Sequence, residues 1–93
     1  MTKQNERLEW IGDSLLNFLV SKFLYEKFKD LNEGELTNKR KKLVSTPILA
    51  KAYGHQKNKS KKQLADMFEV KIAEIYFKKG YNAASKFVQE NLI

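Results

Sequence analysis

The sequence has no cysteine and only one histidine, His55. The lack of cysteine excludes disulfides, thiolate zinc sites and cysteine nucleophiles. With a single imidazole available, a metal site in this chain would have to use oxygen ligands, which suit Mg²⁺ or Mn²⁺. The absence of cysteine also fits an intracellular protein, cytoplasmic or nuclear.

Long apolar runs are missing as well. The longest one, between Leu15 and Leu24, is interrupted by Asn17 and Lys22. It is too short to supply the roughly 20 apolar residues that cross a bilayer. The N-terminus also lacks the basic-then-apolar order of a secretory signal. We therefore expect no association with a membrane.

Acidic residues are in the minority, because 11 Asp and Glu stand against 18 Lys and Arg and give a net charge of +7. Such a balance favours a polyanionic partner, for example a nucleic acid. The 93 residues are enough for one small hydrophobic core and too few for two. We therefore expect a single domain over residues 1–93.

Strand signals are also absent. No two-residue hairpin turn joins alternating apolar runs, and the single proline, Pro47, falls at a helix start signal. Apolar side chains recur at three- and four-residue spacing over residues 5–28, which is typical of a buried helical face. The sequence therefore predicts an all-α fold with a long first helix.

Two shorter helices are predicted next. Asn32 and Glu35 have the spacing of a capping box, in which each side chain satisfies a free backbone amide at a helix start. Thr46 and Pro47 predict another start, with Thr46 as the cap and Pro47 in the first helical position. This third helix is expected to end near Ala52.

The remainder is predicted to form a loop and two more helices. Residues 54–59 are polar and basic and indicate a loop. Ser60 and Gln63 form a second capping box and open a fourth helix. Gly80 suits the left-handed position that ends this helix, and Asn82 is expected to cap the last one.

Acidic residues gather at helical spacing in two of these helices. On the first, Glu6, Glu9 and Asp13 stand at positions i, i+3 and i+7, which share one face. On the fourth, Asp66 and Glu69 are three residues apart. Carboxylates that converge in this way raise one another's pKa unless a cation neutralises them. A divalent ion there would activate water and stabilise the leaving oxygen of a phosphodiester.

The same spacing is also typical of a solvated surface on a lysine-rich helix. Two features favour a site instead. Gly12 lies in the middle of a predicted helix, where glycine costs about 1 kcal/mol relative to alanine, and it stands next to Asp13 among apolar residues. Asp66 lies between Ala65 and Met67, and a buried carboxylate needs a partner.

Residues 5–14, which include Glu9 and Asp13, closely resemble the signature sequence of ribonuclease III catalytic domains. The resemblance continues in the same order along nearly the whole chain, in residues 33–36, 42–44, 49–50, 64–69 and 75–76 and at Gly80. It implies the helical endonuclease fold of that family and the hydrolysis of phosphodiesters in double-stranded RNA.

The resemblance also implies roles for particular acids. A catalytic Mg²⁺, or Mn²⁺ in its place, is expected to be bound by Glu9, Asp13, Asp66 and Glu69. The catalytic residues are expected to be Asp13 and Glu69, together with Glu6 and Glu33, which line the catalytic valley of the family. A homodimer is implied too, with or without exchanged elements, whose two centres cut opposite strands and leave short 3′ overhangs.

Three departures from the family pattern concern the fold. The family has an amphipathic helix ahead of the signature, whereas this sequence starts almost at the signature, so we expect the fold to lack that helix. The connection from Leu49 to Leu64 is shorter than usual. Lys71 and Glu74 replace apolar or small residues on the fourth helix, where they are expected to alter packing or dimer geometry.

Two basic clusters are candidates for contacts with the RNA backbone, although single lysines are more often a solvated surface. The candidates are Lys39, Arg40, Lys42, Lys57, Lys59, Lys61 and Lys62. Six aromatic residues at helical spacing are expected to belong to the core rather than to stack on bases: Trp10, Phe18, Phe23, Phe28, Phe68 and Phe87.

Two alternatives to an active nuclease remain open at this point. One is a non-catalytic relative of ribonuclease III that binds RNA, and the intact set of acids argues against it. The other is a helical module that binds another protein through an exposed apolar face.

Overall fold

The computed structural model describes residues 2–93 and contains five helices joined by short connections. They are α1 (Lys3–Lys27), α2 (Glu33–Leu43), α3 (Thr46–Tyr53), α4 (Lys61–Lys79) and α5 (Tyr81–Leu92). No strand occurs in the described residues, which confirms the predicted all-α class. None of the five helices combines the length and the apolar composition that a bilayer span would need.

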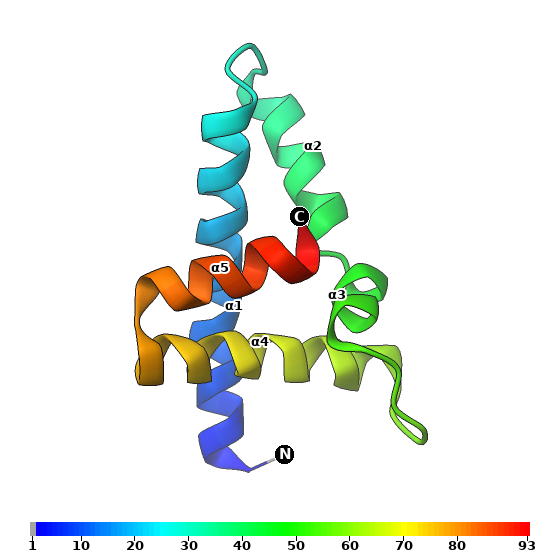
Figure 1. Ribbon diagram of the computed structural model, residues 1–93. Helices are drawn as coiled ribbons and strands as arrows, with labels where there is room; N and C mark the ends of the chain where they lie inside the picture. The colour runs from blue at the N-terminus through cyan, green and yellow to red at the C-terminus, as the bar shows by residue number, and fades with distance from the viewer. Residues whose placement is uncertain (1) are drawn as a thin grey trace.

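The long helix α1 organises the arrangement of the other four (Figure 1). α2 returns along the C-terminal half of α1, and α4 crosses the N-terminal half of α1. α3 packs against α4, and α5 lies alongside α4 on the way back. α4 contacts both α1 and α3 and therefore links the first helix of the chain to the third.

Leu16, Val20, Phe68, Ile72 and Val88 form the centre of the core and are almost completely buried. They come from α1, α4 and α5, and each contributes roughly 1.5–3 kcal/mol through burial. The core therefore lies where α4 and α5 cover α1.

The two predicted capping boxes are confirmed. The Asn32 side chain accepts a hydrogen bond from the Glu35 amide at 2.9 Å, and the Glu35 carboxylate accepts one from the Asn32 amide at 3.1 Å. Ser60 and Gln63 make the same reciprocal pair at 3.1 and 2.8 Å. Local sequence thus determines where α2 and α4 begin.

Two predicted caps are wrong. The N-cap of α3 is Ser45 rather than Thr46, so Thr46 is already helical. Asn82 lies inside α5, because Gly80 is both the last cap of α4 and the first cap of α5. Gly80 has φ 92°, a backbone conformation that favours glycine. The chain therefore turns within one residue and leaves Asn82 nothing to cap.

The expectation that six aromatic residues belong to the core holds only in part. Phe68 is buried, and Phe23, Phe28 and Phe87 pack against the core, but Trp10 is 74% exposed and Phe18 is 54% exposed. Residues two apart on a helix point to nearly opposite sides. Gly12 and Leu16 face inward, so Trp10 and Phe18 face outward.

The charges of Lys71 and Glu74, which depart from the family pattern, are not part of the core of this chain. Lys71 is exposed and Glu74 is half-buried, and no charged side chain is fully buried in the described residues. Residues 54–60 contain no helix, in agreement with the predicted loop. His55 lies in this loop and is exposed.

Candidate metal centre

Gly12 is the point at which α1 and α4 touch. A Cβ atom built on Gly12 would lie 1.9 Å from the carbonyl oxygen of Glu69 and 2.7 Å from its carbonyl carbon. Real Cβ atoms do not approach backbone this closely, so only glycine fits here. The glycine that disfavours the helix by about 1 kcal/mol relative to alanine therefore allows the two acidic helices to meet.

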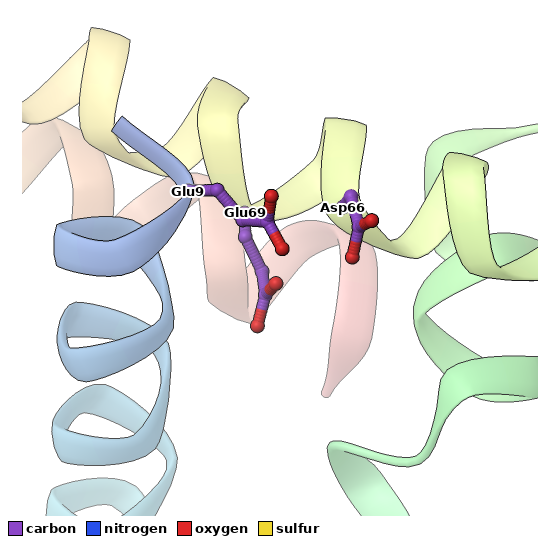
Figure 2. A group of neighbouring side chains, drawn as sticks. All are labelled: Glu9, Asp66 and Glu69. Carbon is purple, nitrogen blue, oxygen red and sulfur yellow. The ribbon is translucent and has the colours of Figure 1, made fainter. Parts of the chain in front are cut away.

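Three carboxylates converge directly beside this contact. Glu9 from α1 and Asp66 and Glu69 from α4 each offer an oxygen, and these oxygens lie within 4.8 Å of one another (Figure 2). Asp13, one turn of α1 beyond Glu9, forms a side-chain hydrogen bond with Glu69. The packing of two helices thus brings together four of the five acids whose spacing suggested a site.

The acids line an open cavity of about 510 Å³ between α1, α3 and α4. Glu6 lines this cavity and is exposed, and Thr46 and Leu49 of α3 also line it. Asp66 keeps only 15% of its side-chain surface exposed and Glu9 only 25%. The carboxylates therefore sit in a groove that an ion or a phosphate can enter from solvent.

Burial and like charge disfavour ionisation in this groove. Burial, aided by the hydrogen bond and charge of Asp13, raises the pKa of the Glu69 carboxyl to about 8. Burial also raises the pKa of Glu9, with a further contribution from the charge of Asp66. Glu69 consequently retains a proton near neutral pH unless a cation is supplied. Oxygen ligands and surplus negative charge fit Mg²⁺ or Mn²⁺.

One cation is already present among the acids. The Lys62 ammonium donates a hydrogen bond to Asp66 Oδ1 at 2.5 Å and lies 3.9 Å from Glu9 Oε1. This hydrogen bond raises the pKa of Lys62. Sequence reasoning grouped Lys62 with the RNA-binding lysines and missed the pairing. The signal was its position four residues before Asp66, where side chains on a helix meet.

Asn17 was also missed by sequence reasoning. Its side-chain amide donates to the backbone carbonyl of Asp13 at 2.9 Å and to the Asp13 carboxylate at 3.2 Å. Asp13 itself is exposed. Asn17 therefore restricts the rotation of this exposed carboxylate, in addition to the bond that Asp13 forms with Glu69.

Glu33, the remaining acid of the predicted set, lies apart from the others. It stands at the start of α2 and lines a separate hollow with Ser21, Tyr25 and Arg40. A single chain therefore does not bring Glu33 to the carboxylates of α1 and α4. Its predicted place in a catalytic valley would require a second protomer.

The predicted RNA-binding residues are divided between two regions. Lys57, Lys59 and Lys61 are exposed in the loop before α4 and at its start. On α2, Arg40 donates a hydrogen bond to the Ser21 hydroxyl at 2.9 Å, and the Lys39 ammonium lies 4.6 Å from the centre of the Phe28 ring. Arg40 and Lys39 thus have partners within the chain, whereas Lys42 and the loop lysines are exposed to solvent.

Several curated proteins resemble this chain. Ribonuclease 3 of Chlorobium luteolum is 33% identical over the whole chain, which covers 40% of that protein. Ribonuclease 3 of Roseiflexus sp. is 36% identical over 90% of the chain and 42% of its own length. Ribonuclease 3 of Glaesserella parasuis is 57% identical over 53% of the chain. The chain spans about two fifths of the length of the first two.

A solved structure and a family model agree with these relatives. The nuclease domain of Ribonuclease III from Campylobacter jejuni has a TM-score of 0.88 and 25% identity, over 99% of this chain and 77% of that one. That structure shows flexibility in a region involved in its own dimer formation. The family model of the Ribonuclease III domain matches residues 6–56, more than half of the 93 residues. This chain belongs to the ribonuclease III family.

Proposed function

We propose that residues 1–93 form the catalytic domain of a metal-dependent endoribonuclease that hydrolyses phosphodiesters in double-stranded RNA. The observation that carries this proposal is the convergence of Glu9, Asp66 and Glu69, whose oxygens lie within 4.8 Å of one another across the α1–α4 contact. Membership of the ribonuclease III family supports the reaction class. The net charge of +7 supports a nucleic acid as substrate.

Four side chains are proposed as the metal ligands: Glu9, Asp13, Asp66 and Glu69. The bound ion, Mg²⁺ or Mn²⁺, would activate water and offset charge on the phosphodiester. Glu69 holds a proton in the metal-free groove because its pKa is raised to about 8, and it gives that proton up when a divalent ion binds. Metal binding therefore becomes tighter as the pH rises toward 8.

The exposed acids act nearer to the substrate in this proposal. Asp13 is exposed at the groove, and Asn17 holds its carboxylate through the bond at 3.2 Å. Glu6 lines the same cavity. We propose that these two carboxylates orient water and the RNA backbone, while the half-buried Glu69 holds the ion.

The RNA is proposed to lie across the groove with its phosphates near the loop lysines, Lys57, Lys59 and Lys61. Contacts of this kind follow the backbone without reading the sequence. A homodimer would supply Glu33 from a second protomer and place two centres on opposite strands, which would leave short 3′ overhangs. Sedimentation of the purified chain tests this step, because a dimer has about twice the monomer mass of 10.9 kDa.

The decisive experiment is incubation of the purified chain with labelled duplex RNA in Mg²⁺ and then with a chelator. We expect cleavage that needs the metal and that Asp13→Ala and Glu69→Gln abolish, with unchanged helical circular dichroism. Glu90→Gln, which alters an exposed acid of α5, is the matched control and should cut normally. Full cutting by Asp13→Ala or Glu69→Gln would refute the assignment. RNA retention without any product would indicate a non-catalytic RNA-binding relative instead.

A further inference from the structure

The Lys62 ammonium occupies part of the space between the proposed metal ligands. It is hydrogen-bonded to Asp66 Oδ1 and lies 3.9 Å from Glu9 Oε1. Glu9 and Asp66 are two of the three acids whose oxygens converge within 4.8 Å. Among the ion pairs of the described residues, only those of Lys62 reach this group, since the other pair joins Lys22 to Glu26.

The two sides of this ion pair differ in how firmly they are held. The Asp66 and Glu9 side chains are 15% and 25% exposed, whereas the Lys62 side chain is 69% exposed. The carboxylates are therefore fixed in the groove, and the lysine reaches them from its mouth. A lysine side chain carries its ammonium on a flexible four-carbon stem, and the ammonium is well hydrated when unpaired. Lys62 can therefore leave Asp66 and Glu9 without disturbing the core.

We propose that Lys62 is the resident cation of the metal-free centre and that a divalent ion must displace it from Asp66 and Glu9. Lys62 is then a positioning residue that weakens metal binding and stabilises the metal-free groove. This inference rests on the proposed function, because it assumes that the same carboxylates bind the metal.

The displacement follows from charge and space. An oxygen lone pair that accepts a hydrogen bond from the Lys62 ammonium is not available to coordinate an ion at the same time. A single positive charge close to a divalent ion also repels it, and this repulsion persists, weakened by solvent, as long as the ammonium stays nearby. Removing the charge should therefore tighten metal binding. The remaining carboxylates then also repel one another more strongly before metal is added, which destabilises the metal-free groove.

Calorimetric titration of Mg²⁺ and Mn²⁺ into the chain tests this. We expect Lys62→Met to lower the Kd by about threefold or more, within the range of an exposed ion pair. The metal-free Tm of the same variant should fall. Lys61→Met removes an equal charge from the neighbouring exposed position and should change neither value appreciably. Lys62→Arg keeps the charge and should stay close to the wild type.

Asp66→Asn separates failure of this inference from failure of the proposed function. If Asp66→Asn weakens binding of Mg²⁺ and Lys62→Met behaves like Lys61→Met, the metal centre stands and the role of Lys62 is refuted. If the wild type binds no metal but Lys62→Met does, the role of Lys62 is supported. If neither binds metal, the proposed metal centre and this inference are both overturned.

Discussion

Gly12 shows at the scale of one residue how the chain positions its acids. Its missing side chain lets the backbone of α1 rest on the carbonyl of Glu69, so Glu9 and Asp13 face Asp66 and Glu69 across a direct main-chain contact. The sequence pointed to this glycine as out of place in a helix, and the structure supplies the reason. No local signal could show that it packs against the turn of α4 that carries Glu69.

Substitution of Gly12 by alanine should be strongly destabilising. Alanine favours helix formation by about 1 kcal/mol, but its Cβ would clash with the Glu69 carbonyl, and overpacking of this kind typically costs 1–3 kcal/mol, occasionally more. Because 1.9 Å is far inside any allowed contact, we expect a net loss of about 2 kcal/mol and a Tm lower by roughly 8–16 °C. Thermal unfolding followed by circular dichroism measures it.

Gly34→Ala is the matched control for that experiment. Gly34 is exposed in α2, and a Cβ there would meet only the Asn32 side chain, at an ordinary 3.5 Å. Its Tm should stay the same or rise slightly. Equal stability of Gly12→Ala and the wild type would show that α1 and α4 do not touch as described.

Glu69 should make the metal-free chain less stable as the pH rises. Its pKa is about 8 when folded and 4.5 when unconstrained, so between these values the folded state binds more protons than the unfolded state. Stability then falls as the pH increases from about 4.5 to about 8. We expect the Tm to fall over this window in chelator, with each 1 kcal/mol lost lowering it by about 4–8 °C.

Two comparisons make the pH experiment specific. Glu69→Gln has no proton to exchange and should show a flatter profile, with the remainder coming from Glu9. Saturating Mg²⁺ should reverse the trend in the wild type, because the ion binds the ionised acids. A metal-free Tm that rises from pH 5 to pH 8 would contradict the raised pKa of Glu69.

At the scale of the helices, the predictions that succeeded depend on residues within one turn of each other. Both capping boxes and the loop before α4 could be identified from sequence because their hydrogen bonds are local. The predicted caps at Thr46 and Asn82 failed because the chain turns earlier, at Ser45 and Gly80. Where one helix follows another directly, tertiary packing decides the boundary.

The capping box of α4 offers a test at this scale. In the wild type, the Gln63 backbone amide donates a hydrogen bond to the Ser60 hydroxyl at 3.1 Å. Ser60→Ala removes this acceptor. The loss should be about 1 kcal/mol, or a Tm lower by roughly 4–8 °C. Ser14→Ala, at an exposed position inside α1, should change the Tm little or raise it slightly. A Tm for Ser60→Ala equal to that of Ser14→Ala would mean that the cap is not formed.

At the scale of the whole molecule, charge and connectivity limited what could be foreseen. The net charge indicated a polyanionic partner, but not which lysines are free to contact it. Lys62 pairs with Asp66 on α4, and Arg40 of α2 donates a hydrogen bond to Ser21. Both side chains therefore already have partners within the chain. The separation of Glu33 from the proposed metal ligands likewise depends on the direction of α2, which no spacing along the chain encodes.

The loop lysines should dominate the salt dependence of RNA binding. Lys57 and Lys59 together changed to glutamine should weaken binding to duplex RNA in chelator and lower the slope of log K against log salt by about two, roughly one for each phosphate contact. Lys78 and Lys79 changed in the same way, at the other end of α4, should leave the slope unchanged. Equal slopes for the two double variants would place the RNA elsewhere.

The main-chain contact between Gly12 and Glu69 also governs how this protein should lose activity when heated. The proposed metal ligands lie on the two helices whose packing holds the core together, so none of them is carried by a hinge or loop that could open on its own. Thermal inactivation should therefore follow the melting curve point by point. No temperature range should exist in which the chain is folded but inert.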